Sequence, residues 1–386
     1  MRLDGIRVVD LTVSLAGPFC TQLLGALGAD VVKIERPDGG DETRAWGPPF
    51  VDGVGVLFLS ANANKRSLAL DLRRPAAVEA VLRLVDRADV FVQSLRPGVA
   101  ESYGLGAGEL TGRNPRVVYC SIGAFGGEGP LASQPGYDPL MQAFTGIMSL
   151  TGEPDGPPVR VGTSVVDQTT GLWAAIGILL ALAEREATGR GGVVDVSLFE
   201  SAIGLVPYQL LSYLVTGEMP QRTGTAFPLI APYQAFRTSD GELMVTAGND
   251  RLFRALCEAL AVPPDPRFAT NPNRVAHREE LGELLSARFR EETSATWLER
   301  LATAGVPAAP VQDVGRAAEH EQTRALELLQ RLDGLTAVRP ALTLDGQRVG
   351  HRMPPPALGA HSADVLREVG YGDEEIASVL GHGPAR

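Results

Sequence analysis

The sequence predicts an α/β fold, because short β-branched runs alternate with helical segments along the first 120 residues. Strands are predicted at residues 7–11, 29–35, 65–72, 89–93 and 117–121, and helices at 18–28 and 75–86. This order of elements implies right-handed crossovers and a mainly parallel sheet.

The next segment, residues 122–166, is rich in Gly and Pro and predicts loops on either side of a short helix at 139–150. Long loops at the carboxyl ends of parallel strands are where α/β proteins bind ligands. Beyond them, the sequence predicts a helix at 168–187, a strand at 192–197 and a helix at 200–214.

From Tyr233 the pattern starts again, with a hairpin that turns at Ser239, Asp240 and Gly241. Helices are predicted at 250–260, 277–289, 294–304 and 314–329, with a strand near 306–314. The tail predicts two short helices with Ser362 and Asp373 as N-caps. We therefore expect a large domain from 1–200, a linker at 201–228, a smaller α/β domain at 229–330, and a return to the large domain at 331–386.

The composition limits the partners. The chain has 386 residues, with 46 acidic against 35 basic side chains, so its net charge of −11 gives no electrostatic reason to bind nucleic acid or an anionic membrane. The longest apolar stretch, Leu172–Ala183, has 12 residues, which is short for a membrane span. The three cysteines lie far apart without a CxxC pair, which predicts neither disulfides nor zinc and favours the cytoplasm.

Several chemistries are disfavoured by missing motifs. A dinucleotide site needs glycines after the first strand, but only Gly17 is found there and a proline follows it. All five histidines lie at or beyond residue 277, so the first 276 residues have no imidazole for catalysis. HExxH, GxSxG and P-loop motifs are absent from the sequence.

Carboxylates and a few cations remain as candidates. Asp167 is read either as a helix N-cap or as a nucleophile whose anion a helix N-terminus stabilises. Asp138 is either a turn residue or a second carboxylate, and Tyr137 either a core residue or a hydroxyl donor. Arg36 follows a predicted strand, where its guanidinium either binds a phosphate or is a solvated loop charge. Three further polar residues fit equally well with binding an anionic ligand and with lying on the protein surface: Asn62, Lys65 and Arg66.

A series of segments along the chain resembles, in the same order, the segments of one known family. The series begins with LDGIRVVDLT and AGPFCTQLLGALGADVVKIERPDGGDETR, followed by NANKRSLALDL and ADVFVQSLRPG. It continues with NPRVVYCSIGAFGGEGP and PGYDPLMQAFTGIMSLTGEPDGPPVRVGTSVVDQTTG, then AGNDRLF, GVPAAPV and LGAHSADVLREVGYGDEEI. Through these segments the chain resembles, from end to end, the family III CoA-transferases, also called the CaiB/BaiF family.

The resemblance implies roles for single residues. It makes Asp167 the catalytic carboxylate, places Tyr137 beside the CoA thioester, and makes Asp138 its acidic neighbour. CoA thioesters are then the substrates, with no tightly bound cofactor and no metal. The implied CoA contacts are Ser14, Leu15, Ala16, Arg36, Leu70, Ser94 and Leu95.

The resemblance also implies a fold and a reaction. We expect a Rossmann-like large domain with a smaller α/β domain, in an interlocked homodimer. CoA would move from a succinyl-CoA-like donor to a small carboxylic acid through an aspartyl anhydride and an aspartyl-CoA thioester. Gly136 or the turn at 247–249 would supply oxyanion donors. Pro135, where formyl-CoA transferases have a lysine, and the missing tetraglycine lid argue against a formyl-CoA:oxalate enzyme.

Two alternatives stay open. An α-methylacyl-CoA racemase of this family has a histidine where Tyr137 stands, which disfavours that reading. A non-catalytic CoA-binding subunit of a heteromeric transferase is the other, and the presence of Asp167 counts against it.

Overall fold

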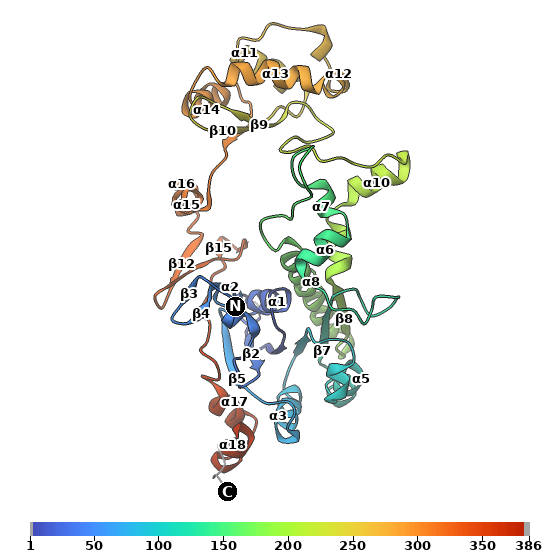
Figure 1. The fold of residues 1–386 in the computed structure, drawn as a ribbon. Helices are drawn as coiled ribbons and strands as arrows, with labels where there is room; N and C mark the ends of the chain where they lie inside the picture. The colour runs from blue at the N-terminus through green and yellow to red at the C-terminus, as the bar shows by residue number, and fades with distance from the viewer. Residues whose placement is uncertain (1–2, 382–386) are drawn as a thin grey trace. The chain divides into compact units, whose positions relative to one another are not determined.

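The computed structural model describes residues 3–381 and divides the chain into two compact units (Figure 1). The large unit comprises Met1–Ile147, Val161–Leu210 and Leu326–Arg386, and the small unit comprises Met148–Arg160 and Leu211–Ala325. The segment 148–160, which we had included in the large domain, thus belongs to the small unit.

A parallel sheet of six strands forms the centre of the large unit. Its spatial order is β5 (Lys65–Ala69), β2 (Asp30–Glu35), β1 (Arg7–Leu11), β6 (Val90–Gln93), β7 (Val118–Gly123) and β8 (Val193–Ser197). All neighbouring pairs are parallel. The order reverses between β1 and β6, and sheets of this kind bind ligands outside the carboxyl ends of the strands at that point.

The strands present different side chains to the two faces of this sheet. Val9 and Leu11 of β1 join a core that contains α3 (Pro75–Val85), α17 (Ser362–Glu368) and α18 (Asp373–Leu380). Asp10, between them, points to the opposite face and meets Thr21 of α1 (Ala16–Ala26).

The helix α8 (Val165–Thr188) packs closely along α1. A Cβ on Gly171 would lie 2.6 Å from the Ala16 carbonyl oxygen, so this helix contact requires glycine.

Short elements complete the large unit around the sheet. They are η1 (Glu42–Ala45), β3 (Phe50–Val51), β4 (Val54–Gly55), α2 (Val56–Ala61), α4 (Val99–Ser102), α5 (Ala107–Arg113), α6 (Asp138–Phe144) and α9 (Leu198–Gly204). Two hairpins follow near the end of the chain: β12 (Leu329–Leu332) with β13 (Leu335–Val338), and β14 (Thr343–Leu344) with β15 (Gln347–Arg348). The returning chain is attached to the N-terminal part, since the Asn64 N–H donates to the Met353 carbonyl.

The small unit is built on a three-stranded antiparallel sheet in the order β11 (Ala308–Pro310), β10 (Glu242–Thr246) and β9 (Tyr233–Arg237). Helices α11 (Asp250–Ala259), α12 (Asn271–Ala276), α13 (Arg278–Phe289) and α14 (Ser294–Thr303) accompany it, with the short η2 (Pro266–Phe268). Phe236 stacks on Phe289 with ring centroids 4.8 Å apart in the centre of its core.

Some predicted elements are wrong. The single helix predicted at 200–214 is two helices, α9 and α10 (Pro207–Thr216), at 68° to each other, because Pro207 has no N–H to continue the helical ladder. The helix predicted at 314–329 is α15 (Val314–Glu319) and α16 (Glu321–Ala325), followed by strand β12. The N-caps in the tail are His361 and Gly372, one residue before those predicted.

The helix α8 is longer than its apolar stretch suggested, with 24 residues. Within residues 3–381, only α8 by itself is long and apolar enough to cross a membrane, and α9 with α10 meets the test as a bent pair. Because α8 packs on α1, β7 and β8 and buries Asp167 near one end and Arg185 near the other, its composition also suits a core helix.

Candidate active site

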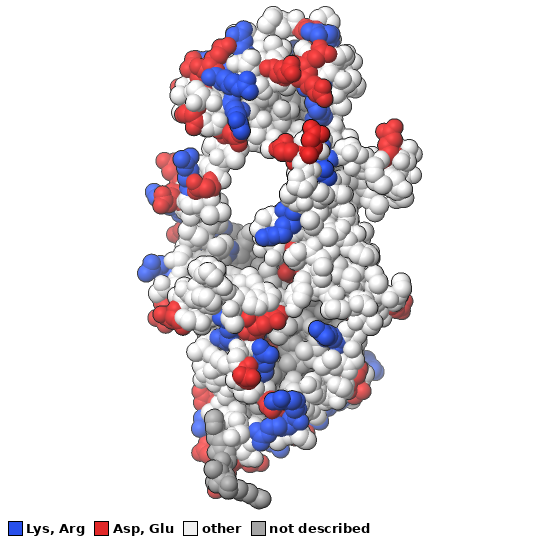
Figure 2. Space-filling model, viewed as in Figure 1, with Lys and Arg blue, Asp and Glu red and all other residues white. Residues whose placement is uncertain are grey.

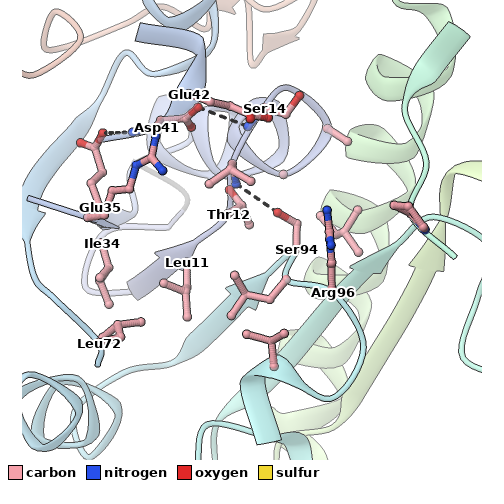
Figure 3. Close-up of a pocket in the computed structure, with 18 of the residues that line it drawn as sticks. Leu11, Thr12, Ser14, Ile34, Glu35, Asp41, Glu42, Leu72, Ser94 and Arg96 are labelled. Atoms are coloured by element: carbon pink, nitrogen blue, oxygen red, sulfur yellow. Dashed lines mark hydrogen bonds between the residues drawn. The ribbon is translucent and has the colours of Figure 1, made fainter. Parts of the chain in front are cut away.

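A cleft of about 690 Å³ lies beyond the carboxyl ends of the central strands (Figure 3). The segments after β1, β2 and β6 contribute Ser14, Arg36 and Ser94 to its lining. It therefore lies where the strand order of the sheet places a ligand site.

Eight of the ten candidate residues line this cleft: Ser14, Ala16, Arg36, Leu70, Ser94, Leu95, Tyr137 and Asp167. Leu15 and Asp138 do not line it, and both are buried. Leu15 is the N-cap of α1, and Asp138 is the first residue of α6.

Asp167 lies in the first turn of α8, and its side chain is 9% exposed. The N-cap of that helix is Ser164, so the reading of Asp167 as the N-cap is wrong. Among residues 3–381, none donates a hydrogen bond to the Asp167 carboxylate. Its position in the cleft lining leaves this carboxylate facing the ligand space.

Asp138 satisfies the N–H groups that an N-cap would normally take. Its Oδ2 accepts hydrogen bonds from the backbone N–H of Val166 at 2.7 Å and of Asp167 at 3.2 Å. Its Oδ1 accepts from Gln142 Nε2 at 2.6 Å, and Gln142 Oε1 accepts from the Val161 N–H at 2.8 Å. The Asp138 carboxylate is therefore fixed from three directions beneath the start of α8.

The pKa of Asp167 is raised from its ordinary value of 3.8 to about 7. Burial is the larger cause, and the charge of Asp138 is the second. We had expected the helix N-terminus to stabilise the anion, and the structure contradicts this. The reason is that the N–H groups of the first turn already donate to Asp138 instead of the Asp167 side chain.

Tyr137 is the N-cap residue of α6 and is about half exposed in the cleft. Its hydroxyl donates to Glu42 Oε1 at 3.3 Å, and its ring centroid lies 6.4 Å from that of Trp46. Partial burial, together with the Glu42 carboxylate, raises the pKa of the Tyr137 hydroxyl. The residue is thus a neutral hydrogen-bonding group in the cleft, and the reading of it as a core residue is wrong.

Three arginines line the cleft, and of these only Arg36 was predicted from the sequence. The others are Arg73 and Arg96, which follow the ends of β5 and β6 within a few residues. That shared position after parallel strands was the available signal. An anionic ligand therefore meets three guanidinium groups here.

The cations considered alongside them have other partners. Lys65 Nζ is fully buried and lies 3.0 Å from Asp10 Oδ2 and 2.9 Å from Asn62 Oδ1. Arg66 forms ion pairs with Asp30 and Glu368. The surface interpretation is therefore wrong for Asn62 and Lys65, which belong to the interior, whereas Arg66 pairs with two partly exposed carboxylates.

The described part of the chain has no group of three or more His, Cys, Asp or Glu residues arranged for a metal ion. The three cysteines are free and buried. No histidine within residues 3–381 lines the cleft, and His382 lies outside the described residues. The acid–base groups of the site are thus carboxylates and a tyrosine.

Comparisons with known proteins agree with these features. The model of CoA-transferase family III matches residues 3–362. A mouse succinyl-CoA:glutarate CoA-transferase is 39% identical over 96% of this chain and 87% of its own length. An acetyl-CoA:oxalate CoA-transferase from Acetobacter aceti is 39% identical over 95% of each chain. The crystal structure of a CaiB/BaiF family protein from Brucella suis superposes with a TM-score of 0.86 at 40% identity, covering 95% of this chain and 99% of that one.

Proposed function

The chain belongs to CoA-transferase family III, and we propose that it moves CoA from a succinyl-CoA-like donor to a small carboxylic acid, with Asp167 as the nucleophile. The observation that carries the proposal is a buried, unpartnered carboxylate in a cleft lined by three arginines. Relatives at similar identity are named for glutarate and oxalate, which are both small dicarboxylic acids.

The proposed reaction proceeds by alternating anhydrides and thioesters. The Asp167 carboxylate attacks the donor thioester carbonyl, and the C–S bond breaks to give a mixed anhydride and CoA thiolate. The thiolate attacks the aspartyl carbonyl, which releases the donor acid and leaves an aspartyl-CoA thioester. The acceptor carboxylate then displaces CoA to form a second anhydride. Attack of the thiolate on the acceptor carbonyl yields the new acyl-CoA and restores Asp167.

The raised pKa of Asp167 supports its role as nucleophile. A carboxylate with a pKa of about 7 is more basic, and therefore more nucleophilic, than one with the ordinary value of 3.8. A pKa near 7 keeps the ionised form accessible at neutral pH. Burial also keeps bulk water from the anhydride, which would otherwise hydrolyse.

Gly136 is the candidate oxyanion donor within the large unit, because it lines the same cleft as Asp167. A Cβ at this position would lie 2.9 Å from the Ala124 Cβ, so only glycine fits without a shift of its neighbours. The other candidate turn, 247–249, belongs to the small unit, and its role stays a prediction.

We assign the cleft arginines to the anionic parts of CoA. Arg36 follows β2, and its Nε donates to the Gly40 carbonyl at 2.9 Å. Such anchoring fixes one side of the guanidinium and leaves its remaining N–H groups for a phosphate. The large unit would be Rossmann-like in that it binds its ligand at the carboxyl ends of parallel strands.

We propose that the chain acts as an interlocked homodimer in the cytoplasm, without nucleic-acid or membrane partners. One face of α8 exposes Leu172, Trp173, Ile176 and Leu180, the last of them 66% exposed. A contiguous apolar face of this kind favours burial against protein, and a second copy is the occupant that the family resemblance implies. Acidic and basic side chains are interspersed on the surface in Figure 2, which suits a chain without a nucleic-acid partner.

The test is intact-protein mass spectrometry after mixing with acyl-CoA donors, succinyl-CoA first, for wild type and Asp167→Ala. The proposal expects a covalent CoA adduct in the wild type and none in the variant. Propionyl-CoA serves as a control donor, because its acyl chain has no free carboxylate.

The other readings give different results in the same experiments. Exchange of the α-proton of a 2-methylacyl-CoA with deuterated solvent, without any adduct, would establish the racemase reading instead. CoA binding with neither adduct nor exchange over the whole donor panel would favour a non-catalytic subunit.

A further inference from the structure

The turn between β1 and α1 has a backbone conformation that needs support. Ser14 has a φ of 68°, in the left-handed region that residues other than glycine rarely adopt. Ser14 lines the cleft and immediately precedes Leu15, the N-cap of α1. Strained residues of this kind persist only where surrounding contacts determine their conformation.

Two interior charges, those of Lys33 and Asp41, hold this turn, and Figure 3 shows Asp41 with its hydrogen bond to Ser14. Lys33 of β2 donates from Nζ to the Thr12 carbonyl at 2.8 Å. The same Nζ lies 2.9 Å from Asp41 Oδ2, while Asp41 Oδ1 accepts the Ser14 N–H at 3.3 Å. The pair therefore holds the turn by a carbonyl at one end and by the N–H of the strained residue at the other.

The other two backbone N–H groups of the turn have their own partners. The Thr12 N–H donates to Asp10 Oδ1 at 3.0 Å, and the Val13 N–H donates to Ser94 Oγ at 3.0 Å. Within residues 3–381, the charged group that hydrogen-bonds to Ser14 is the Asp41 carboxylate.

Lys33 does not line the cleft, and Asp41, which is among the residues of its lining, has no exposed side-chain surface, so we expect both to act on a ligand through the turn. Asp41 also accepts from Thr43, through its N–H at 3.0 Å and its hydroxyl at 2.7 Å, which fixes its carboxylate at the start of η1. A buried ion pair is weak evidence for stability by itself, and such pairs are better explained where they specify one geometry.

We propose that the buried Lys33–Asp41 pair positions the Thr12–Ser14 turn for CoA, so that its loss weakens CoA binding far more than it slows the chemistry at Asp167. The identity of the ligand rests on the proposed function. The two residues are positioning residues, because they act through the backbone of the turn.

The test compares wild type with Lys33→Met/Asp41→Leu, which replaces the pair by apolar groups and leaves no uncompensated charge. Binding of CoA alone is measured by titration calorimetry, and adduct formation by single turnover at saturating succinyl-CoA. We expect the Kd for CoA to rise about tenfold or more, while the rate at saturation stays within about threefold. A Kd within about twofold of wild type would overturn the proposal.

The matched control is Arg185→Met. Arg185 is also buried and lies 2.9 Å from Asp89, but neither residue lines the cleft. This variant should lose stability without changing the Kd for CoA. If the double variant does not fold, D41N decides the question by the same titration.

A second background separates positioning from general damage. Glycine adopts positive φ freely, so in an S14G background the loss of the pair should raise the Kd by a smaller factor. An equal factor in both backgrounds contradicts the proposal. Because the titrant is CoA alone, the outcome is independent of whether Asp167 forms an adduct.

Discussion

Replacing Asp138 by asparagine tests how the site sets the reactivity of Asp167. The Asp138 carboxylate accepts the N–H groups of Val166 and Asp167, and its charge is the second cause of the raised pKa of Asp167. Asparagine keeps one oxygen for these N–H groups and removes the charge. The variant should therefore lower the pKa of Asp167 and leave α8 in place.

The size of the effect follows from the causes of the shift. The pKa of Asp167 rises from 3.8 to about 7, by about 3, and burial is the larger cause. The Asp138 charge thus accounts for at most about 1.5 of this rise, or about 2 kcal/mol, since each pKa unit corresponds to about 1.4 kcal/mol.

The assay is the pH dependence of kcat/KM for adduct formation between about pH 5 and pH 9, whose acidic limb reports ionisation of the free enzyme. In the wild type this limb should have its midpoint near pH 7, and in D138N the midpoint should move to lower pH by no more than about 1.5. An unchanged midpoint in a folded D138N would refute the role given to the Asp138 charge.

A matched variant controls for the lost hydrogen bond. In D138N an amide NH2 group replaces the oxygen that accepted from Gln142 Nε2, so two donors face each other. Rotating the Gln142 amide by half a turn would not help, because its NH2 group would then face the Val161 N–H. D138N/Q142E restores acceptors for both groups, so it should recover about 1 kcal/mol of stability relative to D138N.

Three further predictions concern stability and assembly. The pKa of Asp167 in the folded protein lies above its ordinary 3.8, so ionisation of this residue destabilises the fold as the pH rises toward about 7. Calorimetry should therefore show that D167N raises Tm more at about pH 8.5 than at about pH 5. Burial and the nearby Arg339 lower the pKa of His351, in spite of the hydrogen bond between its ring and the Val338 carbonyl. The neutral His351 ring should therefore contribute to stability above pH 6.5, and this contribution should decline as the pH falls below that value. H351Q should flatten this part of the pH profile of urea unfolding, and an unchanged profile would contradict the assignment. L180E on the exposed face of α8 should shift the mass in sedimentation from dimer toward monomer, whereas an intact dimer would exclude this face from the interface.

The large-unit sheet could be predicted because its strands are short β-branched runs with helices between them. β1 was placed at its observed bounds, and α3 starts at the predicted Pro75. Periodicity was a poorer guide where tertiary contacts decide. The hairpin β12–β13 lies partly in a segment that predicted a helix, because its strands depend on pairing with each other, not on local preference.

The residues of the candidate site were predicted mainly from the family resemblance and less from local sequence patterns. Eight residues from segments far apart meet in one cleft, which spacing alone would not have established. The function of Asp138 as a cap for α8 was not predicted, because it acts on N–H groups 28 and 29 residues further along the chain. The burial of Lys65 was missed for the same reason, since its partner Asp10 is 55 residues away.

The two carboxylates explain how a helix start can hold a weakly acidic aspartate. A side chain in the first turn of a helix normally gains from the free N–H groups there, which lowers its pKa. Here Asp138 accepts those groups from outside the helix, so Asp167 is left with burial and a neighbouring negative charge. The same arrangement holds Asp167 by its backbone, which keeps the carboxylate aimed at the cleft without a hydrogen bond that a substrate would have to displace. One aspartate is thus used for position and the other for reaction, and D138N is the substitution that separates the two roles.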